Sequence, residues 1–239
     1  MTNHLTPRRI LSLIFVIATI AGLAACGVGG STSLTVNDII SKADAAHFKD
    51  ATFTLSLAIK GTFSGTSINT TFTGGGTATS NPQRSDIKFS GSVLGQTVSE
   101  ETITDGDTTY SKSSGDSKWT KSTSSNSGAI PAPDSSSLFG ELKNPKLVGI
   151  EQINGHATYH ISGTAALGTA TPTTSSTSTN ATADVWVRTD NFYPAKATFQ
   201  ASGSDFGVDN GSAIVEIDFT KWDSGVTITV PSPDQVQGS

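Results

Sequence analysis

His156 and His160 have the side-chain types and the spacing that most resemble a metal site in this sequence. In a helix, this four-residue spacing would place both imidazole rings on one face, where they could bind zinc. The two residues lie instead in an alternating segment, residues 147–163, in which Asn154-Gly155 strongly indicates a β-hairpin. Four residues along a strand span about 13 Å, too far for one metal ion. We therefore expect no metal site, but a surface hydrogen-bonding cluster that includes Glu151.

Paired carboxylates are the next candidates, because general acid–base catalysis often uses two such groups. Glu100 and Glu101 are adjacent in a predicted strand, so their side chains point to opposite faces. Asp105 and Asp107 flank a turn glycine and are expected to shape the backbone, with a weak Ca²⁺ contact as the alternative. Glycines 74–76 precede no helix start, and the sequence contains neither a P-loop nor a nucleophile-elbow motif. The sequence therefore predicts no catalytic residue, no cofactor and no enzyme.

The single cysteine, Cys26, stands directly after an apolar run that covers residues 10–25. Arg8 and Arg9 precede this run, and its 16 residues are fewer than the about 20 that a membrane-spanning helix needs. A basic start, an apolar centre and small residues before a break are typical of a secretory signal peptide. Leu23-Ala24-Ala25-Cys26 resembles a bacterial lipobox, where the cysteine receives a diacylglycerol and the preceding peptide is removed. The alternative is a signal peptide that ends by chance near a buried cysteine.

The lipobox resemblance divides the chain into a signal peptide at residues 1–25, a flexible tether at 26–35 and one domain at 36–236. It implies export and anchoring to the outer face of the bacterial cell membrane, with membrane lipid as the partner of acylated Cys26. Loss of residues 1–25 removes Arg8 and Arg9, which leaves 13 basic against 20 acidic residues and a net charge of −7. We expect this acidic body to be held near the bilayer rather than pressed against anionic headgroups.

The composition limits the class of protein. The 239 residues include 33 serines and 35 threonines, whereas 15% of the residues are charged and 35% are hydrophobic. This apolar share is low but sufficient for one core. The net charge of −5 argues against a broad basic face for nucleic acid, and one cysteine excludes an internal disulfide and any multi-cysteine metal site. We expect a monomer that binds no nucleic acid.

Hydrophobic periodicity predicts a mainly β domain with a few helices. Residues 36–48 have helical spacing, whereas residues 51–63 alternate between apolar and polar types, as in a strand with one buried face. Short strands separated by tight turns are typical of an antiparallel meander rather than of βαβ units. Strands are expected at residues 68–73, 86–90, 96–104, 108–112 and 118–122, with turns at 74–76, 81–82, 105–106 and 114–116.

Residues 147–163 are the clearest local unit in the second half of the domain. Their two-residue turn would place Ile153 opposite His156. The same register pairs Ile150 with Tyr159 and Val148 with Ile161. The apolar side chains then share one face of the hairpin, whereas Glu151, His156, Thr158 and His160 lie on the wetter face.

The remaining segments complete the predicted sheet. A short helix is expected at residues 135–142, and the low-complexity Ser/Thr stretch at 164–182 is expected to be an extended loop. The three tryptophans are expected to have structural roles, as is usual in antiparallel sheets. Further strands are expected at residues 184–188, 195–201, 212–222 and 226–230, of which the last two close the sheet.

Several phrases of the sequence together resemble one family. Asn154-Gly155 is followed by Thr158-Tyr159-His160-Ile161-Ser162-Gly163, then by Val185-Trp186-Val187 and Tyr193-Pro194-Ala195-Lys196. This series, with others between about residues 36 and 236, resembles the LppX/LprAFG-type bacterial lipoproteins, which are similar to the carriers LolA and LolB. The resemblance implies an α+β fold, a curved antiparallel half-barrel sheet with helices across its concave face. It also implies an apolar cavity between sheet and helices that takes the acyl chains of lipids or glycolipids.

The resemblance makes lipid or glycolipid binding or transport the expected function, with a membrane transporter as a further candidate partner. The alternative is a cargo-free envelope sensor or interaction module. The Ser/Thr stretch at 164–182 is longer than the family pattern and apolar side chains are sparse, which favours a smaller cavity or none. For each candidate lining residue, the alternative is ordinary core packing against the helices. The candidates are Phe53, Leu55, Leu57, Ile59, Ile87, Phe89, Val148, Ile150, Tyr159 and Ile161.

Overall fold

The computed structural model describes residues 34–63, 65–93, 95–123, 142–167, 179–202 and 209–237, and the statements below concern these residues. Leu34–Ser239 is one compact unit. The signal peptide predicted at residues 1–25, Cys26 and most of the tether predicted at 26–35 lie outside the described residues, so their assignment stays a prediction. None of the helices in the described ranges has the length and apolar character needed to span a membrane.

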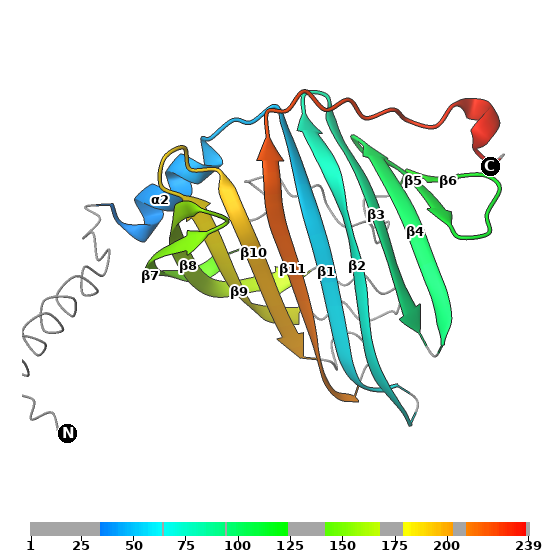
Figure 1. The fold of residues 1–239 in the computed structure, drawn as a ribbon, viewed down its shortest axis with the longest axis horizontal. Coiled ribbons are helices and arrows are strands. Elements are labelled where there is room, and N and C mark those ends of the chain that lie inside the picture. Colours follow the sequence, from blue (N-terminus) through cyan, green and yellow to red (C-terminus); the bar gives the residue numbers. More distant parts are fainter. Residues whose placement is uncertain are drawn as a thin grey trace, which may run out of the picture. The chain divides into compact units, whose positions relative to one another are not determined.

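Eleven strands of the described chain form one antiparallel sheet (Figure 1). β1 (Asp50–Phe63) and β11 (Asp209–Trp222) pair at its centre, although they come from opposite ends of the domain. From β1 the strands run outward in chain order to β6 at one edge, and from β11 they run back to β7 at the other. The predicted mainly β fold and its antiparallel meander are thus confirmed. The other strands are β2 (Thr66–Ser80), β3 (Gln83–Val93), β4 (Gln96–Asp105), β5 (Thr108–Ser113), β6 (Thr120–Ser122), β7 (Leu142–Ile153), β8 (His156–Leu167), β9 (Thr179–Arg188) and β10 (Pro194–Ser202).

The alternating sequence of β1 gives the sheet two different faces. The inner face carries Phe53 and Leu55, which are buried, and the outer face carries Thr52 and Thr54. Helix α2 (Val36–Asp44) packs on the inner face, where its residue Ile39 belongs to the same core as Phe53 and Leu55. The amphipathic sequence of α2 therefore has a definite partner, as a helix of nine residues requires.

Helix α2 begins with a capping box and ends earlier than its apolar spacing predicts. The side chain of Thr35 accepts a hydrogen bond from the Asp38 N–H, and the Asp38 carboxylate accepts one from the Thr35 N–H. The helix ends at Asp44, whereas the sequence predicted residues 36–48. Phe48 lies in the extended connection to β1, where its ring contacts Trp222 at 4.7 Å between centroids. Burial of this ring explains the apolar position without a further helical turn.

Glycines 74–76 form no turn, contrary to the sequence prediction, but lie inside β2. Gly74 pairs with Leu55 and Gly76 pairs with Phe53. A Cβ atom on Gly76 would lie 3.0 Å from the Phe53 ring, and one on Gly74 would collide with the backbone of Lys88. The glycines are therefore required by close backbone approach within the sheet.

The predicted hairpin at residues 147–163 is confirmed around its turn but not at its far end. Ile150 pairs with Tyr159, as the Asn154-Gly155 turn predicts. A bulge between Leu147 and Gly149 then shifts the register, so that Leu147 rather than Val148 lies opposite Ile161. The predicted Val148–Ile161 pair is wrong, and the Val148 side chain is 57% exposed.

The structure differs from the sequence predictions in two further segments. Strands β8 and β9 extend to residues 167 and 179, so both ends of the loop predicted at 164–182 are strand, and 168–178 lie outside the described residues. Ala165 and Ala181 are buried, whereas Thr164 and Thr182 are exposed, which explains how a low-complexity sequence can form strand. Residues 135–141 of the helix predicted at 135–142 also lie outside the described residues, whereas Leu142 begins β7.

The C-terminal segment after β11 is not the closing strand predicted at residues 226–230. It crosses the ends of β1 to β4 and reaches the short helix η2 (Pro233–Gln235) beside β5 and β6 (Figure 1). Ile228 is buried against Ile103 and Trp119, and the Trp119 N–H donates a hydrogen bond to the carbonyl oxygen of Gln235. The alternating apolar residues of this segment are thus satisfied by packing against the sheet rather than by strand pairing.

Replacement of Ile228 by alanine should destabilise the protein by about 2–5 kcal/mol, because a buried branched side chain leaves a cavity. Chemical unfolding monitored by far-UV circular dichroism measures this difference. Thr227→Ala is the matched control, since the neighbouring Thr227 side chain is exposed. Equal stability of the two variants would show that the C-terminal segment does not hold the β4–β6 edge.

Candidate functional site

Half of the predicted lining residues are ordinary core. Phe53, Leu55, Ile87, Tyr159 and Ile161 are at most 8% exposed and belong to the core cluster that includes α2. Space for a ligand between these side chains and the helix would require the core to open. The structure therefore brings these five residues together as packing partners.

The other inner-face candidates lie farther along the strands. Leu57 and Ile59 follow Leu55 on β1 and are half-buried, as is Phe89 on β3. Ile150 is half-buried on β7 and packs at the margin of the core. The inner face thus changes from fully buried next to α2 to partly open beyond it.

A row of apolar side chains crosses this open part of the inner face. Leu57 pairs with Phe72 of β2 on one side and with Val215 of β11 on the other. Val215 pairs in turn with Phe199 of β10. Beyond Phe72 the row continues through a glycine to Val98 of β4, which is 39% exposed. We call Val98, Phe72, Leu57, Val215 and Phe199 the apolar band.

The apolar band was only partly predictable. Alternation in β1 identified Leu57, but Phe72, Val98, Val215 and Phe199 were not among the predicted lining residues. Their position depends on the register of six strands, which no local pattern specifies. Gly91, a glycine inside a strand, is one sequence feature that relates to the band. In the structure, a Cβ atom at this position would lie 2.6 Å from Cδ1 of Phe72.

A hollow of about 630 Å³ opens next to Phe89, outside the core. Phe89 is the one large apolar side chain in its lining, which otherwise contains polar side chains and glycines, among them Lys88, Glu101 and Lys112. Lys88 forms an ion pair with Glu101 at 3.0 Å, so this part of the wall is internally neutralised. The hollow has the volume of a ligand pocket but not the apolar lining that an acyl chain requires.

The predicted polar cluster around His160 is present on the outer face. Its Nδ1 lies 2.8 Å from Glu151 Oε1, and its Nε2 lies 2.9 Å from Asp184 Oδ1. The Trp186 ring stacks on the imidazole at 4.4 Å and donates its Nε1–H to Glu151. His156, the other half of the sequence pair, takes no part in this cluster. Within the described ranges, no three His, Cys, Asp or Glu side chains are arranged to hold a metal ion.

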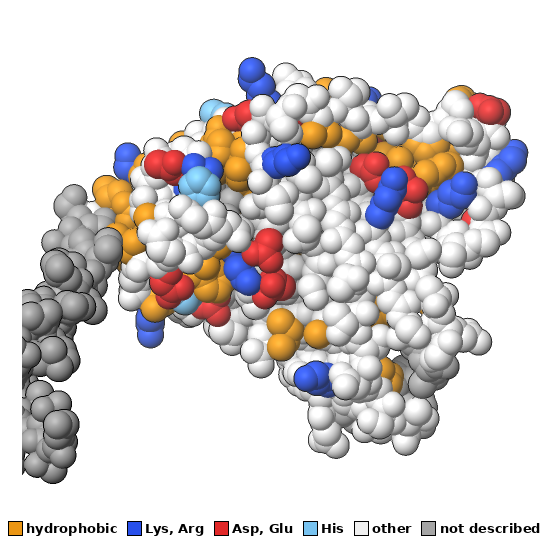
Figure 2. All heavy atoms as spheres, in the orientation of Figure 1, with side chains coloured by type: hydrophobic (Ala, Val, Ile, Leu, Met, Phe, Trp, Pro, Cys, Tyr) orange, Lys and Arg blue, Asp and Glu red, His pale blue; other side chains and the backbone are white. Residues whose placement is uncertain are grey.

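Charges on the outer face are mostly paired with one another. Lys196 of β10 lies 2.9 Å from Glu216 of β11 and 3.8 Å from Asp218. Figure 2 shows these oppositely charged types gathered over β10 and β11, beside a broad area of other side chains and backbone. Burial raises the pKa of Asp218, whereas the hydrogen bond from Lys196 lowers the pKa of Glu216. Such pairing stabilises the sheet and leaves no free acid–base pair at this position.

The remaining candidates for chemistry also have structural partners. Asp105 accepts a hydrogen bond from Arg84 Nε at 2.8 Å, so it is held by β3 rather than by Asp107. Trp222 packs with Phe219 at 5.0 Å between ring centroids, and Trp119 belongs to the cluster around Ile228. These contacts agree with the structural roles expected for the tryptophans.

Glu151 should give the protein an acid-dependent contribution to stability. Hydrogen bonds from Trp186 and His160 lower the pKa of Glu151 below its ordinary value of 4.5. The resulting stabilisation is present above pH 4.5 and is lost as the pH falls through the lowered pKa. Glu151→Gln should therefore reduce the melting temperature near neutral pH, and the difference from wild type should shrink in acid.

Thermal unfolding between neutral pH and about pH 3 measures this effect. Glu100→Gln, the same substitution in β4 and away from Trp186 and His160, is the control. A constant difference between wild type and Glu151→Gln over the whole pH range would contradict the assignment.

Comparison with known proteins places the chain in a family. No curated protein matches it. Lipoprotein LppX of Mycobacterium tuberculosis is 16% identical with a TM-score of 0.47, over 82% of this chain and 100% of LppX. LprF of Mycobacterium bovis is 17% identical with a TM-score of 0.45, over 81% and 95% of the two chains. A LolA superfamily protein of Nitrosomonas europaea is 14% identical with a TM-score of 0.32, over 80% and 93%. The model of the LppX_LprAFG lipoprotein family matches residues 36–228, and this chain therefore belongs to that family, as its sequence motifs predicted.

Proposed function

We propose that this protein is an exported lipoprotein that is anchored through Cys26 and binds or shuttles a lipid by its acyl chains. Membership of a lipoprotein family supports the anchor and export to the outer face of the cell membrane. The apolar band supports lipid binding, and it is the single observation that carries this part of the proposal. Cargo would pass between the protein and the bilayer, or a membrane transporter in it.

The apolar band begins at the margin of the core, where Val215 and Phe199 pack, and extends beyond it. Leu55, two residues before Leu57 on the same face, is 5% exposed because the core next to α2 closes over it. Leu57 and Phe72 are half-buried and do not belong to that core. Apolar surface that stays partly exposed to water is costly, at about 25 cal/mol per Å². An acyl chain lying along the band would remove this cost.

Binding of this kind needs no catalytic group and no fixed polar constellation. Each methylene group transferred from water to an apolar surface contributes about 0.8 kcal/mol, whatever its position along the chain. The band crosses several adjacent strands, which lie about 4.8 Å apart. Its length therefore suits an extended hydrocarbon chain better than a compact polar ligand.

A cargo-free envelope module is the second candidate, and one observation favours it. Five of the ten predicted lining residues are packed as core, and the hollow beside Phe89 is mostly polar. If the apolar band only supports the fold, the protein would act through contacts with another envelope protein. Lipid uptake distinguishes the two candidates directly.

Leu57→Gln should weaken uptake of a fluorescent fatty-acyl probe at least tenfold, because it places an amide in the middle of the apolar band. Ala58→Gln is the matched control, since Ala58 is the next residue of β1 and points to the outer face. Titration of the probe into the chain without residues 1–26 measures both variants, with circular dichroism as the check of folding.

Native mass spectrometry of the same preparations shows whether lipid is retained from the expression host. Probe uptake that falls equally in both variants would place binding elsewhere than on the inner face. Wild-type protein that carries no lipid and takes up no probe would favour the cargo-free module.

Cys26→Ser should move the protein from the membrane fraction to the soluble fraction, because the acyl chains that hold it would be absent. Metabolic labelling with radioactive palmitate, followed by fractionation, measures this change. Ser33→Ala in the same tether is the control and should stay labelled and membrane-bound. A labelled Cys26→Ser protein would contradict the assignment of the anchor.

A further inference from the structure

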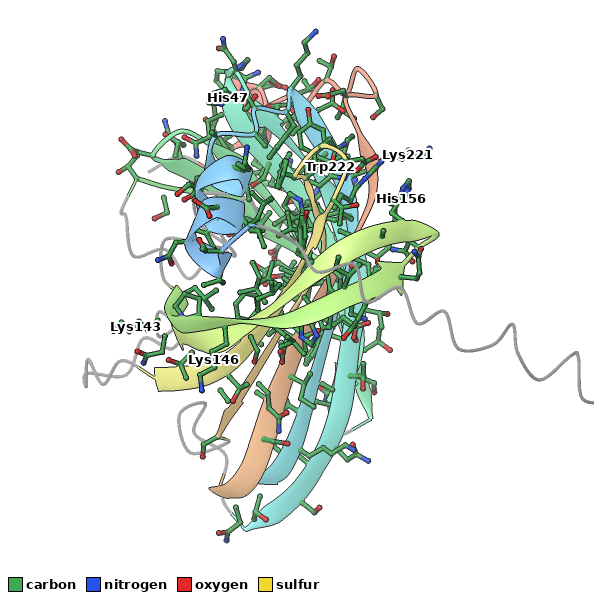
Figure 3. The ribbon with its side chains drawn as sticks, turned by 90° about the vertical axis from the view of Figure 1, so that its left-hand side faces the viewer. His47, Lys143, Lys146, His156, Lys221 and Trp222 are labelled. Atoms are coloured by element: carbon green, nitrogen blue, oxygen red, sulfur yellow. The ribbon has the colours of Figure 1, made fainter. Side chains whose placement is uncertain are left out.

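Strand β7 forms one edge of the sheet and carries two lysines on the same face. Lys143 pairs with Thr164, and Lys146 pairs with Ser162, which places both lysines on the outer face. Both side chains are exposed, and within the described ranges neither has an ion-pair partner. Figure 3 shows them at the same end of the β7–β8 ribbon. These lysines contrast with Lys88 and Lys196, which are paired with carboxylates.

An exposed apolar side chain accompanies the two lysines. Val148 is 57% exposed because the bulge between Leu147 and Gly149 turns it away from the core. The segment 142–150 also contains no acidic residue. Lysines beside an exposed apolar side chain are the composition that suits the interface of an anionic bilayer, where charge and apolar burial act together.

The position of β7 relative to the proposed anchor supports such a contact. Helix α2 packs against β7, and the chain leaves α2 at Leu34 toward Cys26. Leu34 follows Cys26 by eight positions in the sequence, which limits the distance between them to about 29 Å when the chain is fully extended. An acylated Cys26 would therefore hold α2 and the adjoining β7 edge close to the lipid headgroups.

We propose that the β7 edge, defined by Lys143, Lys146 and Val148, docks on anionic phospholipid headgroups of the membrane that holds the protein. The proposal rests on the proposed Cys26 anchor for its biological setting. The domain as a whole carries a net charge of −7 without its signal peptide, so an anionic surface repels most of it. A local basic edge next to the tether would select one orientation, with β7 toward the membrane and the opposite edge away from it.

Protection of a sheet edge is the competing explanation for the same residues. Lysines, a proline and bulges on edge strands prevent pairing with other chains, and β7 contains all three. Under that explanation, removal of the lysines would cause aggregation but would not change affinity for lipid. The two explanations therefore differ in a measurable quantity.

Vesicle sedimentation with the chain lacking residues 1–26, which keeps the whole compact unit, tests the proposal. The probes are vesicles of phosphatidylcholine with and without phosphatidylglycerol, at low and high salt. Wild type should bind only the vesicles that contain phosphatidylglycerol, and salt should weaken this binding. Lys143→Gln/Lys146→Gln should reduce the partition coefficient about 25-fold, or about fivefold per lysine.

Two further variants keep the result interpretable. Lys60→Gln/Lys121→Gln removes two exposed lysines from β1 and β6 and should bind like wild type. Lys143→Arg/Lys146→Arg keeps the charge and should also bind like wild type, even if the glutamine variant folds poorly. Equal losses in both glutamine variants would show that only net charge matters and would overturn the proposal.

Absence of wild-type binding to phosphatidylglycerol vesicles would also overturn it. So would unchanged binding of Lys143→Gln/Lys146→Gln together with its aggregation in size-exclusion chromatography, because that outcome indicates edge protection. These results do not depend on acylation, since the tested chain has no anchor. Failure of the Cys26→Ser experiment would therefore refute the anchor without affecting the measured affinity of the β7 edge.

Discussion

The pairing of β1 with β11 is the constraint on which the rest of the structure depends. It joins two meanders, β1 to β6 and β7 to β11, into one sheet. The two strands are separated by most of the domain sequence, so their association must offset a large loop-closure entropy. Burial of Phe53 against Phe219 and of Leu55 against Ile217 supplies the opposing free energy. The same register places Val215 beside Leu57 and so makes the apolar band continuous.

Local signals in the sequence were sufficient where local chemistry decides the structure. The alternation of β1 and the Asn154-Gly155 turn were predictable, because side-chain period and turn conformation depend on a few neighbouring residues. Glycines 74–76 and the segment 226–230 were not predictable in this way. The glycines are required by the close approach of backbone that is distant in the sequence, and the segment 226–230 packs against the sheet without joining it. The bulge that exposes Val148 likewise has no local signal. The apolar band was missed beyond Leu57 because it depends on cross-strand register.

The two faces and the edge of the sheet have different chemical characters, and together they describe how the protein could work at a membrane. On the outer face Lys196 is paired with Glu216, and the inner face offers a partly open apolar surface. The β7 edge combines an exposed valine with two lysines that have no ion-pair partner among the described residues. Docking through this edge would fix the orientation of the sheet, and with it the position of the inner face, relative to the bilayer. The Cys26 anchor, the β7 edge and the apolar band would then act one after another on the same lipid surface.

Photo-crosslinking with a fatty acid that carries a diazirine in its acyl chain is the most direct test of the central claim, which is binding along the inner face. After irradiation and proteolysis, mass spectrometry identifies the labelled peptides. The account predicts label on β1, β2 and β11, at or next to Leu57, Phe72 and Val215, and competition by unlabelled fatty acid. Label confined to outer-face residues, or label that unlabelled fatty acid does not displace, would contradict it.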